Sequence, residues 1–173
     1  CLGSLDCHSG LNATFAPNTP RAGKIAFISQ SGALGTAIID KAVDEGIGFS
    51  KFVSLGNEAS LNEIDFLQFI KDDTETEFVM MYLEKITDGP KFLSLAKEIT
   101  KTKPVVVIKA GRGASGQKAV MSHTGSLASD DLVMRQAFHQ AGIIVADSIR
   151  QFFNIAKLFS LGIKKPLTEL VIL

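Results

Sequence analysis

The sequence of 173 residues lacks net charge, long apolar runs and a useful number of cysteines. Eighteen basic residues balance 18 acidic ones, so charge gives no reason to expect nucleic acid or a membrane as a partner. No apolar run is long enough to span a bilayer. Cys1 and Cys7 match neither zinc-ligand nor redox-motif spacing, and two cysteines form no disulfide framework. We therefore expect a reduced, cytoplasmic setting and no metal site.

The ends of the chain also lack the usual marks of a complete protein. There is no initiating methionine, and Cys1 does not begin a signal-peptide pattern. We expect a piece of something longer. Residues 1–22 are predicted to be a connector from a preceding domain, residues 23–162 one domain, and residues 163–173 a linker or the start of a following element.

Five apolar segments of strand length alternate with helical patterns within residues 23–162. The expected strands are 24–29, 49–55, 78–83, 105–108 and 143–145, and the expected helices are 32–45, 61–70, 91–100, 130–141 and 149–159. Strands that are apolar throughout imply a parallel sheet covered by helices on both faces. We therefore predict an α/β fold, a flavodoxin-like doubly wound sheet of five strands in the order 2-1-3-4-5.

The most informative segment is Met121–Leu127, which places His123 among small polar residues and glycine. Little side-chain bulk surrounds this histidine, so another molecule can reach its ring. The ring can act as acid, base or nucleophile near neutral pH. The connection from Gly111 to Ser129 is long for a strand-to-helix loop, and such loops are often functional. The alternative is an ordinary surface histidine.

Two sequence-distant residues are expected to join His123 at one edge of the sheet. Ligands bind outside the carboxyl ends of parallel strands, and in the predicted order the first, third and fourth strands are neighbours. Ser31, Glu84 and His123 follow those three strands. Ser31-Gly32 opens a helix, whose free N–H groups and dipole suit an anion, although a plain N-cap turn explains it too. Glu84 could accept a hydrogen bond from the ring and fix its tautomer.

Three other features carry less weight. Gly111–Gly116 formally matches G-x-G-x-x-G, but it follows the fourth strand rather than the first, which disfavours a dinucleotide site. The same segment is no P-loop, because Gln117 stands where the lysine belongs. His139 lies among apolar neighbours on a helix and is interpreted as structural, and His8 lies in the connector.

Several motifs together resemble the nucleoside-diphosphate-forming acyl-CoA synthetases. Gly23–Gly35 resembles their phosphate-helix segment, and Ser54–Ala59 resembles their second-strand loop. Lys109–Arg112 and Ser122–Ala128 resemble their phosphohistidine loop. Succinyl-CoA ligase alpha subunits are similar but more distant. The resemblance covers roughly residues 22–160, with the motifs in the family's order.

The resemblance implies a flavodoxin-like domain that relays phosphate. In this family acyl-CoA, phosphate and ADP (or GDP) are converted reversibly to a carboxylic acid, CoA and ATP (or GTP), the acid here being acetate or another short one. The histidine attacks an acyl phosphate and then carries the phosphoryl group to a nucleotide on an ATP-grasp domain. No cofactor is permanently bound. The magnesium nucleotide and CoA are substrates, held largely by domains outside this chain.

Residue by residue, the resemblance makes His123 the phosphorylated nucleophile and Glu84 the carboxylate that orients it. Ser31 and Gly32 lie at the helix end that holds the phosphate. Gly125 and Ser126 flank the histidine, and their backbone N–H groups are expected to help bind phosphate. The beginning of the chain resembles the tail of a CoA-binding domain.

The implied partners are an ATP-grasp domain or subunit, a CoA-binding domain and a small carboxylic acid, in an oligomeric enzyme. The chain alone is expected to be inactive. The alternative is a regulatory ligase-like domain of a protein lysine acyltransferase, without ligase turnover. The combination of His123 with Glu84 favours the catalytic interpretation. A third interpretation, a flavin or dinucleotide binder, rests on fold analogy alone.

Overall fold

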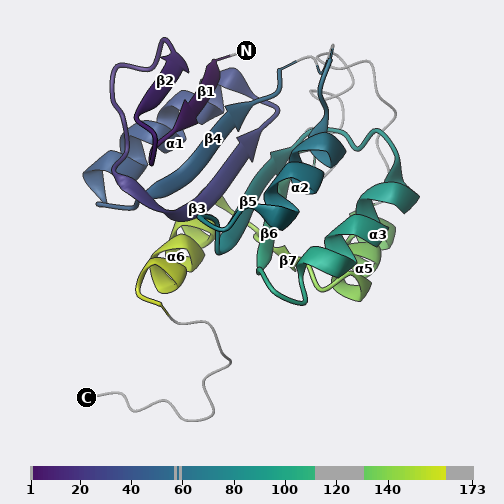
Figure 1. Ribbon diagram of the computed structural model, residues 1–173. Helices are drawn as coiled ribbons and strands as arrows, with labels where there is room; N and C mark the ends of the chain where they lie inside the picture. The colour runs from purple at the N-terminus through teal and green to yellow at the C-terminus, as the bar shows by residue number, and fades with distance from the viewer. Residues whose placement is uncertain (1, 57, 59, 112–130, 163–173) are drawn as a thin grey trace, which may run out of the picture.

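The structure is a computed structural model, and it describes residues 2–56, 58, 60–111 and 131–162 (Figure 1). The strands are β1 (Gly3–Asp6), β2 (Leu11–Thr14), β3 (Ala22–Ser29), β4 (Phe49–Ser54), β5 (Phe78–Leu83), β6 (Val105–Lys109) and β7 (Ile144–Val145). The helices are α1 (Gly32–Asp44), α2 (Glu63–Asp72), α3 (Gly89–Ile99), α5 (Asp131–Gln140) and α6 (Ile149–Ser160). The described strands form one sheet in the order β2-β1-β4-β3-β5-β6-β7.

The parallel part of this sheet confirms the predicted fold. Strands β3 to β7 pair in parallel in the order β4-β3-β5-β6-β7, which is the predicted 2-1-3-4-5. The chain passes from β3 to β4 on one side and then crosses to β5 on the other side, so the switch point lies between β3 and β5. In folds of this kind the crevice for ligands opens at that switch point, outside the carboxyl ends of the strands.

The strand count of five was two short, because β1 and β2 extend the sheet where a connector was expected. β1 pairs antiparallel with both β2 and β4. The carboxylate of Asp6 accepts the N–H groups of His8 and Ser9 at 3.0 and 3.1 Å and closes the turn of this hairpin. Leu2 and Leu5 are each 2% exposed and anchor the hairpin to the core. The strands within residues 3–14 are therefore part of the sheet.

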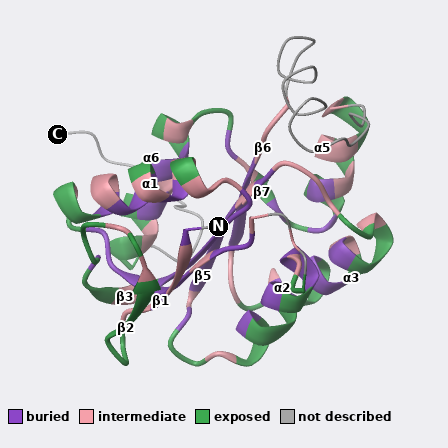
Figure 2. Cartoon of the chain, turned by 90° about the horizontal axis from the view of Figure 1, so that it is seen from above, coloured by how far each residue is buried: buried purple, intermediate pink, exposed green. Residues whose placement is uncertain are grey.

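Two helical layers cover the sheet, as the uniformly apolar strands predicted (Figures 1 and 2). Helices α1 and α6 bury their apolar residues against one face. Helices α2, α3 and α5 bury theirs against the other. Both layers make the interiors of β3, β5 and β6 inaccessible to solvent. Chemistry is thereby restricted to the ends of the strands.

The observed helices start close to the predicted positions because capping side chains mark them. Ser31 caps α1, Asn62 forms a capping box with Asp65 at the start of α2, and Asp88 and Ser148 cap α3 and α6. Residue 130, where the helix 130–141 was expected to begin, and the linker or following element expected at 163–173 lie outside the described residues.

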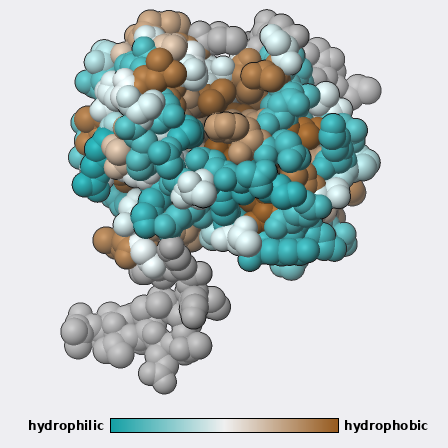
Figure 3. Space-filling model, in the orientation of Figure 1, coloured by the Kyte–Doolittle hydropathy of each residue, from teal (hydrophilic) through white to brown (hydrophobic). Residues whose placement is uncertain are grey.

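The outer surface is mainly hydrophilic on the face seen in Figure 3, with apolar residues gathered in its upper middle. Hydrophilic residues occupy most of the lower and outer parts of that face (Figure 3). Within the described ranges, no helix combines the length and apolar character that crossing a bilayer requires.

Candidate functional site

The first element of the candidate site is the start of α1, at the carboxyl end of β3. The hydrogen-bond ladder of this helix begins with the N–H of Gly35, which donates to the Ser31 carbonyl at 3.0 Å. The Ser31 hydroxyl accepts the N–H of Leu34 at 3.4 Å. The amides of Gly32 and Ala33 precede that ladder, and no acidic side chain lies in the first turn. The positive end of the helix dipole is thus suited to an anion.

Gln30 joins the ends of three neighbouring strands through four hydrogen bonds. Its Oε1 accepts the N–H groups of Glu84 and Lys85 at 2.5 and 2.9 Å. Its Nε2 donates to the Glu58 carboxylate at 2.6 Å and to the Lys85 carbonyl at 3.0 Å. The two donors and two acceptors of this network fix which end of the amide is oxygen and which is nitrogen. Gln30 itself is only 6% exposed.

Lys109 holds the other side of Glu84. Its Nζ donates to the Glu84 carbonyl at 2.6 Å and to the Ala110 carbonyl at 3.0 Å. Burial lowers the pKa of Lys109, while the charges of Glu84 and Asp131 act in the opposite direction. Both backbone polar groups of Glu84 are therefore bound by side chains, one from the end of β3 and one from the end of β6. The peptide of Glu84 is fixed although it lies beyond the last residue of β5.

Glu58 brings a buried negative charge to this edge. Its side chain is 2% exposed, and it forms an ion pair with Lys85 at 3.1 Å. Burial raises the pKa of Glu58, and the neighbouring Glu63 raises it further, against the opposing effects of Lys85 and Gln30. Glu63 is fully buried, and its carboxylate accepts the backbone N–H of Thr87 at 2.7 Å. Two carboxyl groups thus lie close together in a poorly solvated place.

The backbone of Glu58 is also unusual. It has φ of 56°, and among the described residues it is the one non-glycine with positive φ. Such a conformation is uncommon for a residue with a side chain and is found at sites where the surroundings enforce it. Unfavourable conformation and unfavourable burial therefore coincide in one residue.

The structure places three of the predicted site residues at one edge. Ser31 and Gly32 follow β3, and Glu84 follows β5, which is hydrogen-bonded to β3 in parallel register. His123, Gly125 and Ser126 lie outside the described residues. The strand that precedes them in the sequence, β6, ends at Lys109, whose side chain contacts the carbonyl of Glu84.

Sequence reasoning missed the supporting network. Gln30 and Lys109 lay within the motifs that carried the resemblance, but neither was given a role. Glu58 was expected in a strand-to-helix turn, where a carboxylate is normally solvated. The signal available in the sequence was that an amide and a carboxylate, Gln30 and Glu58, follow adjacent parallel strands directly.

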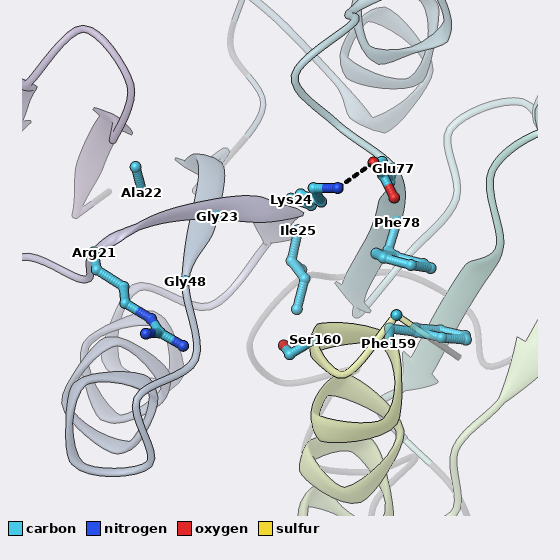
Figure 4. A pocket seen from close by; sticks show the side chains of 11 residues that line it. Arg21, Ala22, Gly23, Lys24, Ile25, Gly48, Glu77, Phe78, Phe159 and Ser160 are labelled. Atoms are coloured by element: carbon cyan, nitrogen blue, oxygen red, sulfur yellow. Dashed lines mark hydrogen bonds and ion pairs between the residues drawn. The ribbon is translucent and has the colours of Figure 1, made fainter. Parts of the chain in front are cut away.

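The opposite, amino edge of the sheet contains a cavity of about 260 Å³ (Figure 4). Lys24 and Glu77 face each other there and form an ion pair at 2.6 Å. Phe78 and Phe159 stack with ring centroids 4.4 Å apart. Its walls comprise Arg21, Ala22, Gly23, Lys24, Ile25, Gly48, Glu77, Phe78, Phe159, Ser160 and Gly162. This cavity lies far along the strands from Gln30 and Glu84, and none of the predicted site residues lines it.

The part of the chain that the structure describes holds no group of three or more His, Cys, Asp or Glu side chains placed to bind a metal ion. The charged groups of the carboxyl edge instead neutralise one another or bind backbone atoms. The arrangement is suited to holding an anion at α1 and a carboxylate, Glu84, in a fixed position nearby.

Comparison with known proteins agrees with this geometry. Residues 22–159 match the succinyl-CoA ligase-like flavodoxin domain. The chain is 47% identical over 158 residues to acetate–CoA ligase (ADP-forming) I of Archaeoglobus fulgidus, covering 91% of this chain and 23% of that protein. It is 45% identical over 171 residues to the 4-hydroxybutyrate–CoA ligase (ADP-forming) of Nitrosopumilus maritimus, covering 96% of this chain and 24% of that protein.

A solved structure has the same fold. The dinucleotide-forming acetyl-coenzyme A synthetase 1 of Candidatus Korarchaeum cryptofilum, in complex with phosphate and ADP, superposes with a TM-score of 0.88 at 43% identity. The match covers 92% of this chain and 35% of that one. The chain belongs to the family of succinyl-CoA ligase-like flavodoxin domains. It spans about a quarter to a third of the length of these relatives.

Proposed function

We propose that this chain is the phosphohistidine-relay domain of an ADP-forming acid–CoA ligase. The whole enzyme would convert acyl-CoA, phosphate and ADP reversibly to a carboxylic acid, CoA and ATP. The observation that carries the proposal is the contact of Lys109 with the Glu84 carbonyl, because it brings the departing strand β6 beside the carboxylate that follows β5. The family match and the ligase names of the relatives support it.

The proposed roles follow from the chemistry of each group. Phosphate replaces CoA on the acyl group to give an acyl phosphate. A ring nitrogen of His123 then attacks its phosphorus, the bond to the carboxylate oxygen breaks, and phosphohistidine and free acid result. ADP afterwards takes the phosphoryl group from the histidine, giving ATP. Glu84 binds the other ring nitrogen and stabilises the protonation state that attack requires.

The phosphate needs hydrogen-bond donors in this scheme. We assign that role to the start of α1 at Ser31 and Gly32, with backbone N–H groups of Gly125 and Ser126 assisting. A helix N-terminus stabilises an anion by about 0.3–1 kcal/mol when exposed and up to about 2 kcal/mol when partly buried. Such a contribution holds the phosphate in place, while the chemistry itself belongs to His123.

The remaining parts of the enzyme would be supplied by other domains or subunits. We propose an ATP-grasp partner for the magnesium nucleotide and a CoA-binding domain for CoA, in an oligomeric cytoplasmic enzyme. The acyl group is proposed to be acetate or another short acid. The names of the relatives include both acetate and 4-hydroxybutyrate, so this domain is expected to leave acyl choice to its partners. Nothing in the ligase names of these relatives favours a regulatory acyltransferase domain.

Labelling of the full-length protein tests the proposal. Incubation with ATP labelled on its γ-phosphate should give an acid-labile, base-stable label on His123. The variant His123→Ala should lose both label and turnover. His139→Ala is the matched control, because His139 is exposed on α5 rather than part of the core, and it should keep both. Full labelling and turnover in His123→Ala would refute the proposal.

A further inference from the structure

Beyond the end of the sheet, the side chain of Gln30 makes hydrogen bonds that main chain makes within the sheet. Within the ladder, the N–H of Gln30 still donates to the Tyr82 carbonyl at 3.1 Å. Beyond this point β3 turns into α1, so its main chain no longer lies beside the residues that follow β5. The N–H groups of Glu84 and Lys85 are bound instead by the Gln30 side chain. One amide thus extends the order of the sheet by two residues.

At the opposite, amino end of β5, main chain rather than a side chain binds the backbone N–H of the adjoining residue. There the N–H of Glu77 donates to the Lys24 carbonyl at 2.9 Å, a main-chain bond between neighbouring strands. The carboxylate of Glu77 pairs with Lys24 near the surface. The backbone N–H of the residue that precedes β5 is therefore bound by main chain, whereas those of the two residues that follow β5 are bound by a side chain. The buried amide of Gln30 at the carboxyl end of β5 therefore needs an explanation other than the pairing of strands.

Glu58 keeps the amide in one orientation at a cost in stability. A buried carboxylate loses its hydration, and a residue with positive φ is strained. Both apply to Glu58, whose side chain is 2% exposed and whose φ is 56°. A carboxylate can only accept hydrogen bonds, so Glu58 binds Nε2 of Gln30 rather than Oε1, which leaves Oε1 directed at the Glu84 amide. Buried polar groups that are costly to keep are typical of functional sites.

We propose that Gln30, held in orientation by Glu58, is the positioning residue for Glu84 in phosphoryl transfer. This inference rests on the proposed function, because it matters only if Glu84 orients His123. Gln30 touches neither phosphate nor the histidine in this role. It fixes the position of the Glu84 peptide and therefore the point from which the Glu84 side chain extends. Lys109 holds the same peptide from the other side. A misplacement of about 1 Å in a catalytic group can cost about 100-fold in rate.

The test uses the full-length enzyme and two readouts, the rate of His123 labelling in a single turnover and steady-state turnover. Gln30→Ala should slow labelling about 10- to 100-fold and lower kcat by a similar factor. The KM values for substrates should change less than about twofold, because Gln30 contacts no substrate. Gln68→Ala is the matched control, since Gln68 lies on the exposed side of α2, and it should leave both rates unchanged.

An exchange of the pair separates positioning from mere packing. In Gln30→Glu combined with Glu58→Gln, residue 30 offers acceptor oxygens to the N–H groups of Glu84 and Lys85, and the amide at 58 donates to it. The bond to the Lys85 carbonyl and the ion pair of Lys85 with residue 58 are lost. This double variant should recover at least half of the labelling rate that Gln30→Glu alone loses. In the single variant two carboxyl groups, at 30 and 58, would face each other near Glu63 and Lys85. No recovery in a folded double variant would overturn the proposal.

A double-mutant cycle with Glu84 asks whether Gln30 acts through that residue. In a Glu84→Gln background, Gln30→Ala should cause little further slowing. Fully multiplicative losses would overturn the proposal. If Gln30→Ala does not fold, the exchanged pair decides instead. An unmodified enzyme that takes no label on His123 would contradict the proposed function, whereas normal labelling with unaffected Gln30 variants would contradict this inference alone.

Discussion

The two ends of strand β5 each carry a glutamate, and the molecule holds the two in different ways. Glu77 precedes the strand, bonds to the backbone of β3 and pairs with Lys24 near the surface. Glu84 follows the strand, and side chains of Gln30 and Lys109 bind both of its backbone polar groups. Main chain binds the backbone N–H of Glu77 at the amino edge, whereas a buried side chain binds the backbone N–H of Glu84 at the carboxyl edge.

The difference separates stability from function. The amino edge is built by close packing, since Gly23 and Gly48 bring two strands together and Phe78 stacks on Phe159. The carboxyl edge accumulates unfavourable features, among them the strained and buried Glu58. Structures that keep such costs generally do so where they serve a reaction. Changes at the amino edge should therefore affect folding, and changes at the carboxyl edge should affect activity.

The largest effect on stability is expected from Gly23→Ala. An added Cβ would lie 2.4 Å from the carbonyl group of Gly48, so main chain would have to move. Overpacking of this kind costs about 1–3 kcal/mol in the free energy of unfolding. Hydrogen-exchange protection of β3 and β4 peptides would measure the loss, while turnover per folded molecule should stay the same. Gly89→Ala, with open space around its Cβ, is the control. Equal protection in both variants would contradict the packing account.

A smaller, pH-dependent effect is expected from Glu58→Gln. Burial raises the pKa of Glu58 above its unfolded value, so the charged carboxylate destabilises the folded protein. At low pH the group is protonated in both the folded and the unfolded state, and this destabilisation is absent. The destabilisation grows as pH rises through the ordinary carboxyl range, about 4.3, and on through the raised pKa. Glu58→Gln should therefore become more stable relative to the unmodified protein as pH is raised to neutral.

Glu98→Gln provides the opposite case. Lys71 lowers the pKa of Glu98, so the stability that this group contributes is present above its unfolded pKa and is lost as pH falls. Relative to the unmodified protein, this variant should lose stability as pH is raised. Denaturant unfolding across the acid-to-neutral range measures both trends, and parallel trends in the two variants would contradict the difference in pKa.

The smallest effect is expected from Lys24→Met at the amino edge. Its ion pair with Glu77 is partly exposed, with 62% of the Lys24 side chain and 27% of the Glu77 side chain accessible. Exposed pairs contribute about 0.2–1 kcal/mol, and salt screens them. Thermal unfolding at low and high salt should show a small loss that shrinks as salt is added. A loss of turnover in this variant would contradict the assignment of function to the carboxyl edge.

The sequence was sufficient to predict the parallel part of the fold, since short β-branched runs such as Val105–Ile108 are apolar on both faces and are typical of buried strands. It was insufficient for β1 and β2, because these strands are short and β2 is mostly exposed. The turn between them is closed by the Asp6 carboxylate and a glycine, Gly10, at φ of 75°, which is a hairpin signal of low specificity.

The site was partly predictable for a similar reason. Ser31 and Glu84 could be placed at one edge from strand order alone, because residues that directly follow parallel strands must meet there. Gln30 could not be assigned, since its function depends on register between β3 and β5 and on a turn that buries Glu58. Composition and spacing indicate which residues reach an edge, but hydrogen-bond partners across strands are set by three-dimensional packing.

The central claim is that phosphoryl transfer takes place at the carboxyl edge, and one matched pair of variants tests it most directly. Glu84→Gln and Glu77→Gln make the same chemical change at the two ends of β5 in the full-length enzyme. The rate of His123 labelling should fall about 10-fold or more in Glu84→Gln, as expected when a carboxylate no longer orients a reactive histidine. It should stay within about twofold in Glu77→Gln, whose loss is a surface ion pair. Equal rates in the two variants, or slower labelling in Glu77→Gln, would contradict the account.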